Sequence, residues 1–244
     1  MTKAAVVGVA GLIRTGKTQT LRNIILQNKQ CQFVVFDSAP IQSPQFLQGR
    51  MRGGVFVHKA GSLCASETVV VRRMEHIAGA LKGKRVVVYQ DERDAFTKPT
   101  LDAFLSFCTL NLAGVVVVLD EVDVSEELGA DTKKIPLHWK VSISKGAHVY
   151  NLGKRGISLL WCVQDIGQLN RYLLGQTSIV FVHKTNDPLQ IRKLQARFQV
   201  PFDGDRLARM EKYRCFRVDV GERVEPVQGR SQYKITDFTP KGQR

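Results

Sequence analysis

The chain has 244 residues, 43% of them hydrophobic, and its 36 Lys and Arg against 22 Asp and Glu give a formal net charge of +14 at pH 7. This length and apolar content are enough to bury a full core, and we expect one main domain. The excess of positive charge favours a polyanionic partner, with nucleic acid as the first candidate, and a merely solvated basic surface is the alternative.

The composition also bears on membranes and metals. No uncharged apolar run of about 18 residues occurs, so we expect no transmembrane segment. The first apolar run leads directly into a glycine-rich loop, so we expect no removable signal peptide. Five cysteines lie far apart without the spacing of a zinc site, and we interpret them as reduced core residues: Cys31, Cys64, Cys108, Cys162 and Cys215.

Short runs of Val, Ile and Leu alternate with helix-length segments along most of the chain. Such runs are typical of strands covered on both faces, so the pattern predicts an α/β fold with three layers, in which helices flank a mostly parallel central sheet. The predicted strands are 3–10, 31–38, 53–60, 84–91, 113–121, 156–164 and 177–184. The predicted helices are 18–27, 67–81, 99–112, 137–152 and 188–198. We divide the chain into a main domain, 1–220, and a basic polar extension, 221–244.

The first predicted strand runs into VAGLIRTGKTQT, residues 9–20, and then into the first predicted helix. The spacing G-x-x-x-x-G-K-T is the P-loop, or Walker A, signature, whose backbone N–H groups face nucleotide phosphates at a helix N-terminus. Lys17 is expected to reach the β and γ phosphates, and the Thr18 hydroxyl is expected to hold Mg²⁺. Arg14 stands where many relatives of this loop have glycine. The predicted nucleotide-binding residues are Gly11, Arg14, Thr15, Gly16, Lys17, Thr18 and Gln19.

A second motif follows the P-loop by roughly a hundred residues. GVVVVLDEVD, residues 114–123, has the form of a Walker B strand that ends in two acids. Asp120 is expected to bind Mg²⁺, and Glu121 is expected to orient and polarise the attacking water. Acidic pairs at strand ends are common, but this pair after a P-loop favours nucleotide hydrolysis over transfer to a small acceptor.

The third motif is RGISLLWCVQDIGQL, residues 155–169. A polar side chain at the end of a strand beside Walker B can sense the γ-phosphate, and Gln164 has this position. A glutamine that only caps a strand or turn is the alternative interpretation.

The order of these elements over roughly residues 4–198 resembles the HerA/FtsK superfamily of DNA-pumping ATPases. The acidic pair at 120–121 and the strand that ends in Gln164 carry the resemblance, which implies a RecA-like P-loop NTPase with ATP and Mg²⁺ as cofactors. We expect the chain to be nearly a bare motor domain, a minimal form that is similar to the genome-packaging ATPases of internal-membrane icosahedral viruses. The resemblance therefore implies a ring, expected to be a hexamer, that pumps double-stranded DNA independently of its sequence.

In that superfamily an arginine finger lies near the helix before the sensor strand. Here the text is LGKRGI, one residue shorter, so Lys154 and Arg155 compete for the role, and Arg155 is preferred because a guanidinium can bridge two phosphate oxygens. A solvated basic helix end is the alternative. The cations that could line a DNA pore are Arg50, Arg52, Arg72, Arg73, Lys82, Lys84 and Arg85.

Three other functions stay open. They are a conjugative or plasmid-transfer motor of the same superfamily, a P-loop kinase of nucleotides or small molecules, and a nucleotide switch or DNA-binding module without turnover. A capsid vertex or a membrane protein is a further candidate partner. The expected location is the cytoplasm, which is the host cytoplasm for a viral protein, with association with the virion as an extension of that expectation.

Overall fold

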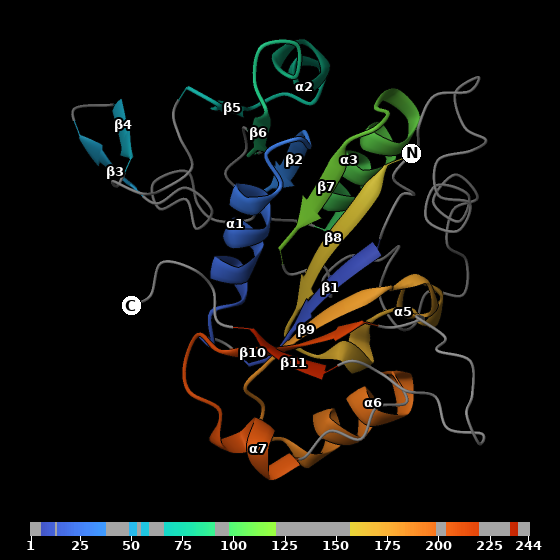
Figure 1. The fold of residues 1–244 in the computed structure, drawn as a ribbon. Helices are drawn as coiled ribbons and strands as arrows, with labels where there is room; N and C mark the ends of the chain where they lie inside the picture. The colour runs from blue at the N-terminus through green and yellow to red at the C-terminus, as the bar shows by residue number, and fades with distance from the viewer. Residues whose placement is uncertain are drawn as a thin grey trace.

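The computed structural model describes residues 6–12, 14–37, 49–52, 55–58, 66–90, 98–120, 157–198, 204–219 and 235–238. Nine strands form one sheet in the order β11-β10-β9-β1-β8-β7-β2-β6-β5 (Figure 1). The strands are β1 (Val6–Ala10), β2 (Phe33–Phe36), β5 (Thr68–Val71), β6 (Val86–Tyr89), β7 (Val116–Leu119), β8 (Ser158–Val163), β9 (Ile179–His183), β10 (Cys215–Asp219) and β11 (Ile235–Phe238). The seven strands from β9 to β5 pair in parallel, and β10 and β11 continue the sheet antiparallel.

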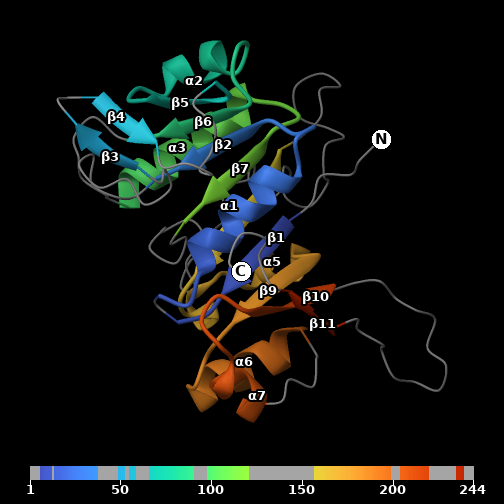
Figure 2. The same cartoon turned by 60° about the vertical axis from the view of Figure 1, so that its left-hand side comes forward.

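Helices cover both faces of this sheet, and alternate strand residues supply the two cores. On one face Leu21 and Ile25 of α1 (Lys17–Gln27) pack on Val9, Val35 and other strand residues. The core on the opposite face includes residues of α3 (Lys98–Asn111), α5 (Arg171–Gln176), α6 (Pro188–Phe198) and α7 (Gly204–Arg209). Figure 2 shows α1 on the near side of the sheet. The remaining helices are α2 (Glu75–Ala80) and the short 3₁₀ helix η2 (Ile166–Gln168).

The centre of the sheet places the two nucleotide motifs one strand apart. β1 pairs with β8 on one side and β9 on the other, and β8 pairs with β7. Gly8 of β1 lies opposite the fully buried Trp161 of β8, and a Cβ at Gly8 would overlap the indole ring. The indole N–H donates to the hydroxyl of Thr177 at 3.2 Å, which satisfies the polar atom of this large core side chain.

The predicted three-layer fold is confirmed, but the structure corrects one predicted helix and places one predicted strand outside the main sheet. The helix predicted for 67–81 begins as strand β5, because Val69 to Val71 are β-branched and pair with β6, and only Glu75–Ala80 is helical. The run at 53–60 is the strand β4 (Val55–His58), which pairs antiparallel with β3 (Gly49–Arg52) in a separate two-stranded sheet. The helix predicted for 137–152 lies outside the described residues. Within 221–244, strand β11 joins the edge of the main sheet, and the division at residue 220 stays a prediction.

Two further expectations concern membranes and cysteines. Within the described ranges, no helix combines the length and the apolar character needed to cross a membrane. Among the described residues, Cys108, Cys162 and Cys215 are buried and Cys31 is half-buried, and none of these four is in a disulfide. Cys64 lies outside the described residues. Burial raises the pKa of the Cys108 thiol, which therefore stays protonated and unreactive.

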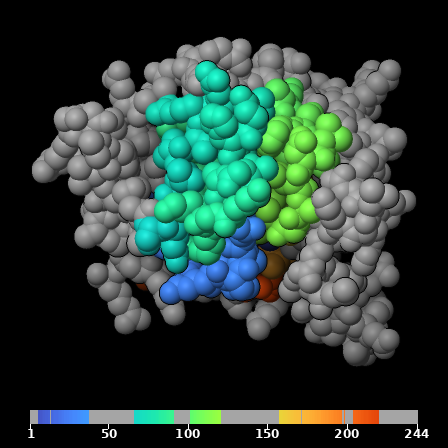
Figure 3. Space-filling view, turned by 90° about the horizontal axis from the view of Figure 1, so that it is seen from above, coloured from blue at the N-terminus to red at the C-terminus, as the bar shows by residue number. Residues whose placement is uncertain are grey.

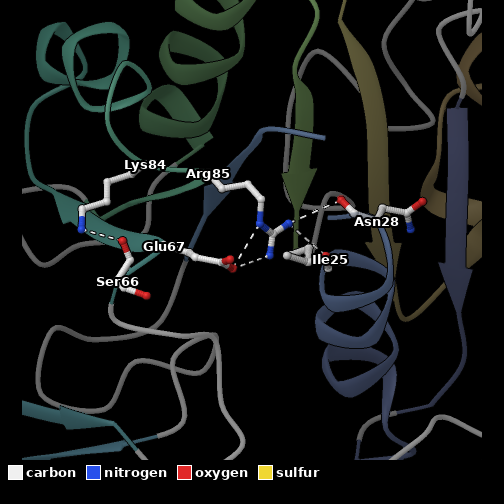
Figure 4. A network of polar contacts seen from close by, with 6 residues as sticks. All are labelled: Ile25, Asn28, Ser66, Glu67, Lys84 and Arg85. Atoms are coloured by element: carbon white, nitrogen blue, oxygen red, sulfur yellow. Dashed lines mark hydrogen bonds and ion pairs between the residues drawn. The ribbon is translucent and has the colours of Figure 1, made fainter. Parts of the chain in front are cut away.

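Two of the cations proposed above to line a DNA pore are used inside the fold (Figure 4). Arg85, with 14% of its side chain exposed, donates from Nε and Nη2 to Glu67 at 3.2 and 3.1 Å. Its Nη1 donates to the carbonyl oxygens of Ile25 and Asn28 at the end of α1, at 3.2 and 3.4 Å. The Lys84 ammonium donates to the carbonyl oxygen of Ser66 at 2.7 Å. We therefore remove Arg85 from the candidate DNA contacts.

The exposed cations of the same segment lie on a different surface. Figure 3 shows residues 66–90 over the top of the molecule, beside α3 and the end of α1. Arg73 and Lys82 are exposed there, whereas Arg72 is half-buried and its Nη1 is a buried atom without a hydrogen-bond partner. The side chains of Arg50 and Arg52 on β3 are outside the described part of the structure. Arg73 and Lys82 thus stay predicted phosphate contacts.

Candidate functional site

Six neighbouring parallel strands end in polar residues at one edge of the sheet. β1 ends in the P-loop, β7 in Asp120, and β8 in Gln164, and the flanking strands β9, β2 and β6 end in His183, Asp37 and Gln90. In open α/β sheets, ligands bind outside the carboxyl ends of the strands. This edge is therefore the candidate site.

The P-loop backbone has the conformation that its glycines allow. Gly11 has φ 148° and Gly16 has φ 107°. Arg14 has φ 60°, in the left-handed region that glycine favours, and its side chain is exposed. Gly16 caps α1 without a side-chain hydrogen bond, and the first turn has no acidic residue. The N-terminal N–H groups of α1 consequently suit an anion such as phosphate.

The side chains of Lys17 and Thr15 both donate to one carbonyl oxygen within the P-loop. The Lys17 ammonium, in a residue only 8% exposed, donates to the carbonyl oxygen of Leu12 at 2.8 Å, and the Thr15 hydroxyl donates to the same oxygen at 2.8 Å. A positive charge is thereby held at the mouth of the loop, beside the N-terminus of α1. The loop is arranged for anion binding before any ligand arrives.

Thr18 and Asp120 meet at the centre of the site. The Thr18 hydroxyl donates to Oδ2 of Asp120 at 2.9 Å, although 102 residues and the strand β8 separate them. Asp120 is buried, at 5% exposure. A hydroxyl and a carboxylate oxygen are hard ligands of the kind that Mg²⁺ binds, so this pair fits the predicted ion.

The structure describes some of the other predicted site residues but not all of them. Gln164 follows β8, between the P-loop strand and the Asp120 strand, and is half-buried. Gln19, on α1, donates to Asn23 Oδ1 at 3.4 Å and accepts from Arg22 Nη1 at 3.3 Å. Glu121, Lys154 and Arg155 lie outside the described residues.

A buried polar pair extends the site two strands past Asp120. The Gln90 amide at the end of β6 donates to Oδ2 of Asp37 at the end of β2, at 3.2 Å, and both residues are buried. Burial lowers the pKa of Arg22 on α1, and the carboxylates of Asp120 and Asp37 oppose that shift. Arg22 thus lies within the electrostatic reach of both acids and links the Mg²⁺ candidate site to the Asp37–Gln90 pair.

His183 lies behind the P-loop, and the sequence analysis did not find it. Its side chain is fully buried, with Nε2 2.9 Å from the Thr20 hydroxyl and Nδ1 3.2 Å from the carbonyl oxygen of Thr15. Burial, and then the charge of Lys17, lower its pKa to about 4. The available signal was a polar residue at the end of a buried strand, the same argument that selected Gln164.

The P-loop between β1 and α1, with Asp120 bonded to it across β8, defines a P-loop NTPase fold. The solved structures with this fold include viral packaging ATPases. The genome packaging NTPase B204 from Sulfolobus turreted icosahedral virus 2, in complex with ATP-gammaS, is 13% identical over 96% of this chain and 98% of that chain, with a TM-score of 0.65. Its complex with AMPPCP gives 14% identity, coverage of 96% of each chain and a TM-score of 0.64.

B204, the DNA-packaging ATPase from Sulfolobus turreted icosahedral virus, is 15% identical over 96% of this chain and 98% of that chain, with a TM-score of 0.59. A lower similarity, with a TM-score of 0.45, joins the chain to ATPases 2 and 3 of EssC from Geobacillus thermodenitrificans, at 14% identity over 97% of this chain and 40% of that chain. No protein-family model matches the chain, and no curated protein matches it. The predicted likeness to packaging ATPases is therefore confirmed for the fold.

Proposed function

We propose that the protein is an ATP-hydrolysing DNA translocase that packages a viral genome. The observation that carries the proposal is the hydrogen bond between Thr18 and Asp120, since it joins the P-loop to the Walker B strand in the arrangement that nucleotide hydrolysis needs. The full-length likeness to B204 adds support, because its fold spans 96% of this chain.

The residues of the site take distinct roles in this proposal. The N–H groups at the start of α1 and the Lys17 ammonium bind the phosphates, while Thr18 and Asp120 hold Mg²⁺. When bound, Mg²⁺ supplies positive charge that offsets the charge on the phosphates. Glu121 directly follows Asp120 in the chain and accepts a proton from the attacking water. Gln164 senses the γ-phosphate from the strand between the two motifs.

The net charge of +14 supports DNA as the polymer. Arg73 and Lys82 are exposed cations, and contacts of cations with phosphates carry no sequence information, which favours sequence-independent binding. We further propose a ring, with six subunits as the expected number, in which Arg155 reaches the nucleotide of the adjacent subunit. A cytoplasmic location and docking on a capsid vertex belong to the same proposal.

The decisive experiment measures the ATPase rate with and without double-stranded DNA. We expect DNA to raise the rate of the unaltered protein, whereas a P-loop kinase would transfer phosphate to an acceptor and would not respond to DNA. Lys17→Ala should abolish turnover by removing the cation that holds the phosphates. Glu121→Gln should bind ATP and stall, because the amide cannot take a proton from water.

Two outcomes would contradict this proposal. A rate indifferent to DNA removes the translocase function and leaves nucleotide hydrolysis. A Glu121→Gln protein that turns over ATP at the unaltered rate removes the general-base role of Glu121, and Asp123 is then the next carboxylate to vary. Arg85→Lys keeps the charge at a cation that is used inside the fold, so this control variant should respond to DNA as the unaltered protein does.

A further inference from the structure

The last residue of β9 and the chain just before β10 both contact the P-loop. The carbonyl oxygen of Thr15 receives two hydrogen bonds from this side, from Nδ1 of His183 at 3.2 Å and from the backbone N–H of Tyr213 at 2.9 Å. The Tyr213 ring also lies against Gly16, since a Cβ at Gly16 would be 2.6 Å from its Cδ1. The Thr15–Gly16 peptide is therefore fixed on one side by two donors.

The geometry of the Thr15–Gly16 peptide determines where the Gly16 N–H points. In a trans peptide, the carbonyl and the following N–H point to opposite sides, and the described residues contain no cis peptide bond. With the Thr15 carbonyl held toward β9 and β10, the Gly16 N–H points away from them. That N–H is at the N-terminus of α1, where phosphate-binding loops present their donors.

The chemistry of the contacts sets the state of the histidine ring. A carbonyl oxygen can only accept, so the contact with Thr15 assigns the proton to Nδ1. The Arg214 backbone is a second hydrogen-bond partner of the ring. The ring is neutral, because burial and the charge of Lys17 lower its pKa to about 4, and Nε2 then accepts from the Thr20 hydroxyl. One neutral imidazole thus contacts both the loop, at Thr15, and α1, at Thr20. Gly11 leaves room for it, since a Cβ there would be 2.6 Å from the Cβ of His183.

We propose that His183 is a positioning residue that presets the Thr15–Gly16 peptide for phosphate, through an Nδ1–H donor to the Thr15 carbonyl. The inference rests on the proposed nucleotide binding and deepens it, because it assigns the orientation of one phosphate-facing N–H to a side chain on the neighbouring strand. His183 itself does not touch the nucleotide in this scheme.

Two substitutions separate the two ring nitrogens. The amide nitrogen of asparagine occupies the place of Nδ1, so His183→Asn keeps a donor for the Thr15 carbonyl. The longer glutamine places its amide near Nε2, so His183→Gln keeps a partner for Thr20 and loses the donor to Thr15. We expect His183→Gln to weaken the affinity for ATP-gammaS with Mg²⁺ about tenfold, the effect of one lost hydrogen bond at a buried group, and His183→Asn to recover most of that loss.

The matched control is Thr177→Val, which removes a buried hydroxyl at the C-cap of α5 that donates to Leu173 and accepts from Trp161. It should lower stability and leave the affinity for ATP-gammaS unchanged, which shows that instability alone does not weaken binding. A measurement independent of the ligand is the ¹⁵N spectrum of His183 in the nucleotide-free protein. It should show a neutral ring with the proton on Nδ1.

The possible outcomes distinguish a failure of the positioning role from a failure of the proposed nucleotide binding. If the unaltered protein binds ATP-gammaS and His183→Gln binds it equally well, the positioning role is wrong and the nucleotide site stands. A proton on Nε2 instead of Nδ1 overturns the positioning role in the same way. If the unaltered protein binds no nucleotide, the proposed function fails and the inference falls with it.

Discussion

His183 gives the folded state a stability that depends on pH. Its pKa is about 4 in the folded protein and about 6.5 in an unfolded chain. Above pH 6.5 the ring is neutral in both states, and as the pH falls from 6.5 to 4 only the unfolded chain takes up a proton. Unfolding is therefore favoured in this window, and the linkage predicts a loss of about 2 kcal/mol in the free energy of unfolding between pH 7 and pH 5.

Chemical denaturation at the two pH values checks this expectation. His183→Asn lacks the titrating ring and should lose less stability over the same interval. His76, which is exposed on α2, provides the control, since His76→Asn should keep the pH dependence of the unaltered protein. An equal pH dependence in His183→Asn and in the unaltered protein would assign the acid sensitivity to other groups.

The site residues differ in how far the sequence could predict them. Lys17 and Thr18 are fixed by a local spacing, and Asp120 is fixed by its place at the end of an apolar run, so each is readable without the fold. The structure brings Thr18 and Asp120 into hydrogen-bond contact, and their role as Mg²⁺ ligands stays a prediction. The roles of Thr15 and His183 in one network could not be read, because they depend on β9 being the neighbour of β1. The order of strands in a sheet depends on the whole chain and cannot be predicted from the spacing of a local motif.

The segment from β5 to β6 shows how one element is secured on its neighbours. Arg85 precedes β6, pairs with Glu67 before β5, and donates to two carbonyl oxygens at the end of α1. Arg85→Ala should lower the free energy of unfolding by about 1–3 kcal/mol, since it removes charge-assisted bonds and leaves half-buried acceptors without a donor.

Urea denaturation of Arg85→Ala measures this contribution. Lys82→Ala, at an exposed position of the same segment, is the matched control and should change stability by less than about 0.5 kcal/mol. Equal stabilities for the two variants would show that the Arg85 network contributes nothing beyond an exposed charge.

The same segment marks the limit of prediction at the level of elements. The apolar spacing of 67–81 also fits a helix, and only the pairing of Thr68–Val71 with Val86–Tyr89 makes its first part a strand. The central strands were predictable because each is a continuous apolar run covered on both faces. The antiparallel β10 was not, because its five residues include the charged Arg217 and Asp219 and do not form a continuous apolar run.

At the scale of the whole molecule, the candidate site lies along one edge of the sheet. The P-loop, Asp120 and Gln164 follow β1, β7 and β8, which are neighbouring strands. In the proposed function, one subunit contributes the loop, the proposed Mg²⁺ ligands and the proposed sensor. The proposed ring adds a single group from outside, the arginine of the adjacent subunit.

This last contribution can be tested by mixing two inactive proteins. An arginine finger is worth about 10³ to 10⁵ in rate in related phosphoryl-transfer chemistry, so a lone subunit should be nearly inactive. Arg155→Ala lacks the proposed finger and keeps the P-loop, whereas Lys17→Ala lacks the P-loop lysine and keeps the finger. A site shared between subunits predicts that the mixture recovers ATPase activity that neither protein shows alone. Lys154→Ala, the neighbouring cation, should retain activity, because an ammonium cannot bridge two phosphate oxygens as a guanidinium does. Normal hydrolysis by Arg155→Ala alone would remove that residue from the mechanism, and full activity of a strictly monomeric preparation would remove the ring.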